Sequence, residues 1–143
     1  MATENLINKR QDEIVEEFSL FDDWLDRYQL IIDRGRALEP LPESCRTPDN
    51  LIDGCQSRLW LDVSRNEDGT MHLRADSDAF IIKGIVAMLI DVLNDSDPRD
   101  IAEADLYFIR EIGLSENLSP IRSNGLLALI KQIRAYALAY TLK

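Results

Sequence analysis

The sequence predicts an α+β fold in which a small antiparallel β-sheet packs against helices. Three observations support this class. Apolar residues have helical spacing near both ends of the chain, apolar and polar residues alternate in a middle section, and a nearly continuous apolar segment follows that section. With 143 residues the chain has the length of one domain, and we expect residues 1–143 to fold as a single unit.

The N-terminal region has the pattern of one long amphipathic helix or of two shorter ones. Its apolar residues recur at spacings of three and four: Ile14, Phe18, Phe21, Leu25, Tyr28 and Ile32. Ser19, Asp22 and Asp23 are candidate N-caps, so a break between two helices is expected within residues 19–23. Gly35 is the expected end of the second helix.

A loop and a β-hairpin are expected next. Residues 36–54 are rich in turn-forming residues and prolines, so little regular structure is predicted there. The prolines are Pro40, Pro42 and Pro48. Apolar and polar residues then alternate in 58–65 and 70–75, with a turn sequence at 66–69 between them. Each strand has one apolar face, which fits a sheet covered by helices on one side.

Helices are expected throughout the C-terminal half. Residues 79–94 are apolar nearly all round, which is typical of a buried helix. An N-cap aspartate followed by a proline at 97–98 predicts a helix that ends near Gly113. A serine and a proline at 119–120 repeat this order before a last helix of about 122–140.

The net charge of −10 narrows the classes of partner. Nucleic acids and anionic membranes are bound by basic surfaces, so we expect neither, whereas docking on other proteins is compatible with an acidic chain. The longest apolar stretch, residues 79–93, is too short to span a bilayer and contains Lys83 and Asp91. The first residues lack the pattern of a secretion signal, and two cysteines do not make a disulfide framework. We therefore expect a cytoplasmic protein with reduced thiols.

Few residues support metal or hydrolytic chemistry. Cys45, Cys55 and His72 are the only cysteine and histidine side chains, whereas a structural zinc site takes four such ligands and an iron–sulfur cluster about four thiolates. We therefore expect no metal site. His72 lies on the polar face of a predicted strand, so we expect it to face solvent rather than act as a catalytic base. The chain has no P-loop, dinucleotide fingerprint or nucleophile elbow.

Thiol chemistry remains, and Cys55 is the candidate for it. Cys55 follows Gly54, whose backbone freedom suits a turn, and precedes a predicted strand. An exposed thiolate can accept sulfur from a divalent sulfur in another protein without a metal or a histidine. The alternative is that Cys55 fills space in the core at the start of the strand. Cys45 is a second thiol, and a disulfide between the two stays open because sequence spacing does not give their separation.

Three stretches, taken in order, resemble the SufE family of cysteine desulfuration proteins. They are D-G-C-Q-S-R-L-W-L at 53–61, D-S-D-A-F-I-I-K-G at 76–84 and L-S-P-I-R-S-N-G-L at 118–126. The register of the resemblance runs from about residue 14 to about residue 139. It implies an α+β fold shared with the IscU-type iron–sulfur scaffolds.

The resemblance also implies a function. Members of the family accept persulfide sulfur from a SufS-type cysteine desulfurase, stimulate that enzyme and pass the sulfur towards iron–sulfur cluster assembly. The acceptor cysteine of the family falls on Cys55. The residues with supporting or partner-binding roles fall on Gly54, Gln56, Ser57, Asp78 and Arg122. No cofactor is implied for this chain, because the pyridoxal phosphate belongs to the desulfurase. The implied partners are that enzyme and a downstream scaffold, and a homodimer is compatible with the sequence.

Two of these residues have two interpretations each. Asp78 either caps the buried helix that follows it or tethers the Cys55 segment by accepting backbone N–H groups, and we favour the cap. Arg122 either has a functional role, in which it binds a partner carboxylate or favours the thiolate form of Cys55, or is a surface arginine near a helix start. Because that position is mildly unfavourable for a cation, we favour a functional role. We also expect residues 50–57 to move on docking, with Gly54 as the hinge.

Three other functions stay open from the residues alone. The first is an iron–sulfur scaffold of the IscU type, which the small number of metal ligands disfavours. The second is a thiol redox sensor that uses Cys45 and Cys55. The third is a docking adaptor without chemistry of its own.

Overall fold

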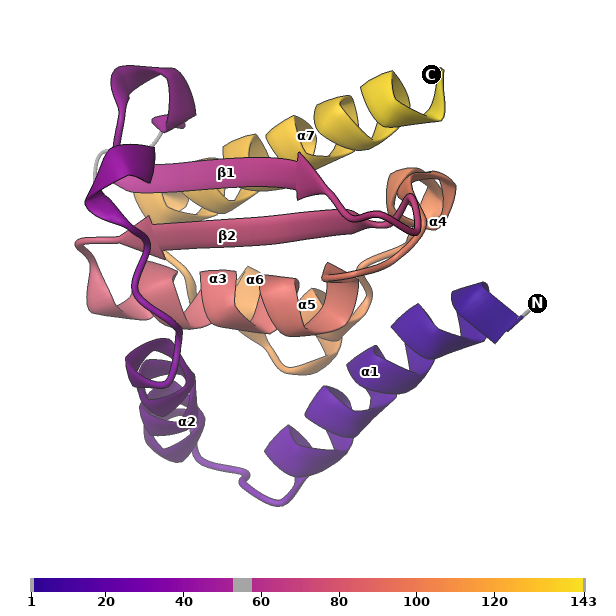
Figure 1. Ribbon diagram of the computed structural model, residues 1–143. Helices are drawn as coiled ribbons and strands as arrows, with labels where there is room; N and C mark the ends of the chain where they lie inside the picture. The colour runs from indigo at the N-terminus through magenta and orange to yellow at the C-terminus, as the bar shows by residue number, and fades with distance from the viewer. Residues whose placement is uncertain (1, 53–57, 143) are drawn as a thin grey trace.

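A hairpin surrounded by helices forms the fold (Figure 1). The computed structural model describes residues 2–52 and 58–142. The helices of this part are α1 (Ala2–Ser19), α2 (Trp24–Arg36), α3 (Phe80–Leu93), α4 (Pro98–Glu103), α5 (Phe108–Glu111), α6 (Leu114–Asn117) and α7 (Pro120–Thr141). The strands are β1 (Leu59–Arg65) and β2 (Met71–Ser77), and single 3₁₀ turns occupy Glu43–Cys45 and Pro48–Asn50. The predicted α+β class is confirmed.

The N-terminal region forms two helices with a break at residues 20–23, as predicted. Asp23 is the N-cap of α2, and its Oδ1 accepts a hydrogen bond from the backbone N of Leu25 at 3.0 Å. This bond satisfies one of the free N–H groups of the first helical turn. Ser19 is the last residue of α1, and Asp22 lies one residue before the N-cap of α2, so neither of the other two candidates is the cap.

The prediction that Gly35 ends α2 is wrong, because this glycine packs against α3 instead. The helix continues to Arg36, and Gly35 is buried opposite Gly84 of α3. A Cβ atom on Gly35 would lie 2.8 Å from the backbone nitrogen of Gly84, and a Cβ atom on Gly84 would overlap the backbone oxygen of Ile31. The two helices therefore touch backbone to backbone, and the close approach requires both glycines.

The predicted hairpin is confirmed, with a longer second strand. β1 and β2 pair in antiparallel register, so that Leu59 lies opposite Ser77. The turn at residues 66–69 places Gly69 at a φ of 90°, a conformation that favours glycine. β2 extends to Ser77, two residues beyond the predicted end, because its pairing continues to the first residue of β1.

Different parts of the chain cover the two faces of the sheet. α3 packs on the apolar face, where Leu61 and Leu73 are buried. The sequence predicts an open second face, but Trp60 on that face is only 8% exposed. Arg46, from the proline-rich loop, has its guanidinium carbon 5.0 Å from the centroid of the Trp60 ring. The loop is therefore part of the packing of the fold rather than a simple connection.

The region between α3 and α7 is predicted as one helix but contains three short ones. Side chains from distant helices bond to the backbone where α4 ends. Arg134 of α7 donates to the carbonyl of Ala104 at 2.8 Å. Gln11 of α1, which is fully buried, donates to the carbonyl of Asp105 at 3.0 Å and accepts from the amide of Phe108 at 3.2 Å. These partners satisfy backbone groups that a continuous helix would have paired internally.

α7 is the predicted last helix, although it begins at Pro120 rather than near Arg122. It packs mainly against α4 and runs alongside the sheet in Figure 1. Neither α7 nor any other helix in the described residues is long and apolar enough to cross a bilayer.

Candidate functional site

The candidate site lies where β1 begins and β2 ends, next to the first turn of α3 (Figure 1). The residue before positions 53–57 is fixed at this end of the sheet. The backbone N of Ile52 donates to the carbonyl of Leu59 at 2.8 Å, and Leu51 forms an isolated antiparallel bridge with Trp60. Four predicted site residues lie outside the described residues, and their roles stay predictions: Gly54, Cys55, Gln56 and Ser57.

Arg58, the residue after these positions, is fixed by three hydrogen bonds. Its backbone N donates to Oδ1 of Asp78 at 3.0 Å. Its carbonyl accepts from the backbone N of Asp78 at 3.2 Å and from the hydroxyl of Ser77 at 2.7 Å. Asp78 is exposed, so it holds the backbone of Arg58 from the surface of the molecule.

The interpretation of Asp78 as a helix cap is wrong. The N-cap of α3 is Ala79, and no side chain caps the first turn there. The hydroxyl of Ser77 accepts a hydrogen bond from the backbone N of Ala79 at 3.2 Å, while the Asp78 carboxylate is directed to Arg58. The alternative interpretation, an acidic residue that accepts a backbone N–H beside the Cys55 segment, agrees with this geometry.

A buried carboxylate lies next to this contact. The side chain of Asp76 is 3% exposed, and its Oδ2 is 2.5 Å from Nη2 of Arg46. Its Oδ1 is 3.3 Å from Nζ of Lys83 and accepts from the backbone N of Ser77 at 2.8 Å. One carboxylate thus connects the proline-rich loop, the end of β2 and the first turns of α3. A buried charge of this kind needs such partners.

Sequence reasoning missed Asp76 and its two cations as parts of the site. The signal in the sequence is an acidic residue, Asp76, two residues before Asp78 in the same motif. Its partners Arg46 and Lys83 come from other elements, so spacing along the chain could not identify them. The remaining predicted residue, Arg122, lies in the first turn of α7, and its side chain is outside the described set.

Cys45 is a free thiol and is half-buried. Nη2 of Arg74 donates to its Sγ at 3.3 Å. The same guanidinium nitrogen is 2.8 Å from Oδ2 of Asp62, and the hydrogen bond with Asp62 raises the pKa of Arg74. Arg74 therefore remains a cation whose main partner is the carboxylate of Asp62, and the thiol is a secondary contact.

His72 has the surface role that its position in the strand predicts. Its Nδ1 is 3.0 Å from Oδ1 of Asp95, and its side chain is 37% exposed. The hydrogen bond with His72 lowers the pKa of Asp95. In the described part of the chain no group of three or more histidine, cysteine and acidic residues is arranged to hold a metal ion.

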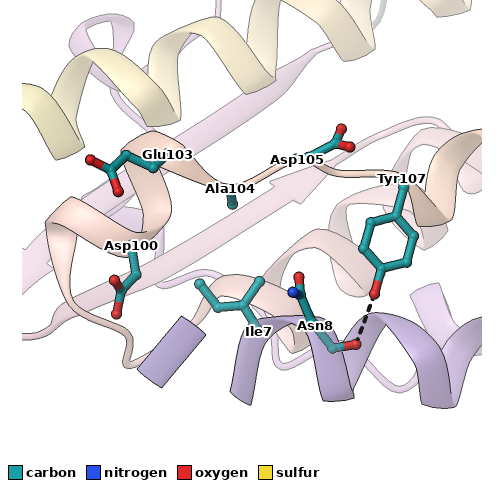
Figure 2. A pocket seen from close by; sticks show the side chains of 7 residues that line it. All are labelled: Ile7, Asn8, Asp100, Glu103, Ala104, Asp105 and Tyr107. Atoms are coloured by element: carbon teal, nitrogen blue, oxygen red, sulfur yellow. Dashed lines mark hydrogen bonds between the residues drawn. The ribbon is translucent and has the colours of Figure 1, made fainter. Parts of the chain in front are cut away.

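A cavity of about 330 Å³ lies at the opposite end of the molecule, between α1 and the region of α4 and α5 (Figure 2). Asp100, Glu103 and Asp105 line it, together with Tyr107. The hydroxyl of Tyr107 donates to Asp12 at 2.6 Å, and burial and this acceptor raise the pKa of Tyr107 to about 12. Because the tyrosine stays protonated at neutral pH, it joins α1 to α5 rather than serving as a base.

Comparison with known proteins identifies the family. The chain matches the SufE model, described as an Fe-S metabolism associated domain, over residues 12–137. An uncharacterized SufE-like protein of Rhizobium etli is 41% identical over 138 residues, covering 94% of this chain and 93% of that protein. The solution structure of a hypothetical protein from Thermus thermophilus has a TM-score of 0.76 at 21% identity, covering 94% of this chain and 97% of that one, which supports the fold.

The chain therefore belongs to the SufE family, as its motifs predicted. Membership connects it with Fe–S metabolism. The three motifs all fall within the matched residues, and the hydrogen bond from Arg58 to Asp78 joins the first two motifs at the candidate site.

Proposed function

We propose that this protein accepts persulfide sulfur on Cys55 from a SufS-type cysteine desulfurase and carries it towards iron–sulfur cluster assembly. The observation that carries the proposal is the family match over residues 12–137, which includes the D-G-C-Q-S sequence. The hydrogen bonds of Ile52 and Arg58 support it, because they fix both flanks of that sequence at one end of the sheet.

The proposed transfer needs only a thiolate and a donor persulfide. The thiolate of Cys55 attacks the outer sulfur of the persulfide on the desulfurase, and a new S–S bond forms at Cys55. The S–S bond of the donor breaks, and its electron pair leaves with the donor cysteine as a thiolate. One persulfide replaces another, so no oxidant or reductant is consumed. The pyridoxal phosphate that generates the persulfide belongs to the desulfurase.

Asp78 and Arg122 have separate roles in this proposal. Asp78 is a positioning residue, because its carboxylate holds the backbone N–H of Arg58, three residues after Cys55. Arg122, at the start of α7, binds a carboxylate of the desulfurase. Gly54, Gln56 and Ser57 shape the approach to Cys55. The reaction takes place in the cytoplasm, where thiols stay reduced, and a downstream scaffold receives the sulfur.

The direct test is intact-mass measurement after the protein has been mixed with a SufS-type desulfurase and free cysteine. We expect the wild type to gain the mass of one or more sulfur atoms, and dithiothreitol to remove that mass. Cys55→Ser should gain none. Cys45→Ser is the matched control, because it removes the other thiol of the chain and should still be loaded.

Two results would contradict the proposal. Sulfur loading that persists in Cys55→Ser and disappears in Cys45→Ser would show that the acceptor is the other cysteine. A wild type that gains no sulfur but binds iron through its cysteines would support the scaffold alternative instead.

A further inference from the structure

Phe80, the first residue of α3, is exposed although most of that helix is buried. Its relative exposure is 75%, whereas the rest of α3 is buried or half-buried except at Asp91. In the described part of the chain the other large hydrophobic side chains that are exposed are leucines, so Phe80 is the one aromatic ring among them. The ring adds nothing to the core, and phenylalanine is a weaker helix former than alanine. The fold therefore gives no reason for an aromatic residue at this position.

Phe80 lies at the end of the hairpin where β1 begins and β2 ends (Figure 1). Asp78, two residues before it, accepts the backbone N–H of Arg58 at 3.0 Å and donates its own N–H to the carbonyl of Arg58 at 3.2 Å. Arg58 is exposed, and within the described residues its guanidinium makes no hydrogen bond or ion pair. An exposed ring, an exposed carboxylate and an unpaired guanidinium therefore share this end of the sheet. Protein–protein interfaces have this composition, with aromatic residues and arginine at the centre and polar groups at the rim.

We propose that Phe80 is an anchor residue of the interface with the desulfurase, where its ring is buried in an apolar recess of that enzyme. The inference rests on the proposed function for the identity of the partner. The transfer brings the two sulfur atoms into bonding contact, so the desulfurase must cover the surface around Cys55. Aromatic side chains that become fully buried at such a surface carry much of the binding free energy, because each buries about 150–250 Å².

The lengths of chain involved allow one interface to include both Cys55 and Phe80. Cys55 is three residues before Arg58, and three residues of chain span at most about 11 Å. Phe80 is two residues after Asp78, which adds at most about 8 Å, and the hydrogen bonds between Arg58 and Asp78 join the two stretches. An interface of standard size covers about 800 Å² of each partner, which is a patch about 30 Å wide. An interface that includes Cys55 is therefore wide enough to include Phe80.

Calorimetric titration with the pyridoxal-phosphate-loaded SufS-type desulfurase, in the absence of free cysteine, tests the inference. We expect Phe80→Ala to weaken binding by at least about 10-fold. Leu20→Ala is the matched control, because Leu20 is 77% exposed in the connection between α1 and α2, away from the sheet (Figure 1), and should bind like the wild type. Neither substitution should lower the thermal unfolding midpoint, since both side chains are exposed. Wild-type affinity for Phe80→Ala, or equal losses in the two variants, would overturn the inference.

Hydroxyl-radical oxidation of side chains, followed by mass spectrometry, tests the same inference on the wild type. Phe80 should oxidise at least about 3-fold more slowly in the saturated complex than in the free protein, because the centre of an interface excludes water. Leu20 should oxidise at the same rate in both. Equal rates for Phe80 in the two states would overturn the inference. So would a free wild type that sediments as a dimer and becomes a monomer in Phe80→Ala, because the ring would then bind a second copy of this chain.

The two proposals fail in different ways. Where the inference holds, Phe80→Ala needs more desulfurase for a given rate of sulfur loading but reaches the wild-type rate at saturation, because the ring takes no part in the exchange of S–S bonds. If Cys55 is loaded at the same half-saturating concentration of desulfurase in the wild type and in Phe80→Ala, the anchor inference fails and the sulfur-acceptor function stands. Absence of sulfur on the wild type counts against the function, whatever the affinity of Phe80→Ala.

Discussion

Two neighbouring residues of α3 hold this helix in contrasting ways. Gly84 lets the backbone of α3 touch the backbone of α2, with Ile31 against it. Lys83 reaches in another direction, to the buried carboxylate of Asp76 at the end of β2. The first contact excludes even a methyl group, whereas the second consists of charged side chains and hydrogen bonds. The difference indicates that the α2–α3 crossing depends on close backbone packing, whereas the end of the sheet at the candidate site depends on charge pairing and hydrogen bonds.

The largest effect is expected for Gly84→Ala. The new Cβ would overlap the carbonyl of Ile31, and a backbone atom cannot be displaced cheaply, so α2 and α3 must separate. We expect the free energy of unfolding to fall by more than about 3 kcal/mol, measured by urea denaturation. Gly69→Ala is the control: its site is open and its cost comes from a φ of 90°, about 1 kcal/mol. Equal losses for the two variants would show that the crossing is not tight.

A smaller but coupled effect is expected for Asp76→Ala. It leaves Arg46 and Lys83 without the carboxylate that both of them contact, which costs about 2–3 kcal/mol. This is less than for a fully buried pair because both cations are about one third exposed. Thermal unfolding of Asp76→Ala, Arg46→Met and the double variant gives the coupling. Additive losses would mean that Arg46 and Asp76 do not stabilise each other.

Local signals in the sequence predict most of the elements. Asp23 marks the start of α2, and Gly69 marks the turn of the hairpin. The wrong predictions all involve contacts between distant parts of the chain. Gly35 has the local pattern of a helix end, and its packing partner Gly84 cannot be identified from local sequence because it is far away along the chain. The segment after α3 has the pattern of a continuous helix because nothing local reveals Gln11 and Arg134 as partners of its backbone.

The candidate site likewise contains residues that local sequence identifies and residues that only long-range contacts identify. The motif around Cys55 identifies the family, since a short run of specific residues carries that information without the fold. The second motif draws attention to Asp78 but not to its partner, because the amide of Arg58 comes next to it only through the pairing of β1 with β2. Asp76 could not be assigned from the sequence, because its cations come from the loop and from α3.

The smallest effect on stability, and the most informative about the site, is expected for Asp78→Ala. The carboxylate is exposed and gives up one hydrogen bond, so we expect a loss of about 1 kcal/mol or less in the free energy of unfolding. The rate of sulfur loading on Cys55 should fall several-fold, because the backbone of Arg58 loses the acceptor that positions it. Loading is followed by intact mass at a fixed concentration of desulfurase.

Asp78→Asn separates positioning from charge. It keeps an oxygen that can accept from the N–H of Arg58 but removes the negative charge, so it should restore loading close to the wild-type rate if positioning is the role of Asp78. Amide exchange at Arg58 should follow the same order, fast in the alanine variant and slow in the asparagine variant. If loading stays slow in Asp78→Asn while the Arg58 amide remains protected from exchange, the negative charge of Asp78 acts on the partner rather than on the backbone of Arg58. The polar end of the sheet would then be a binding surface as well as a support for its own backbone.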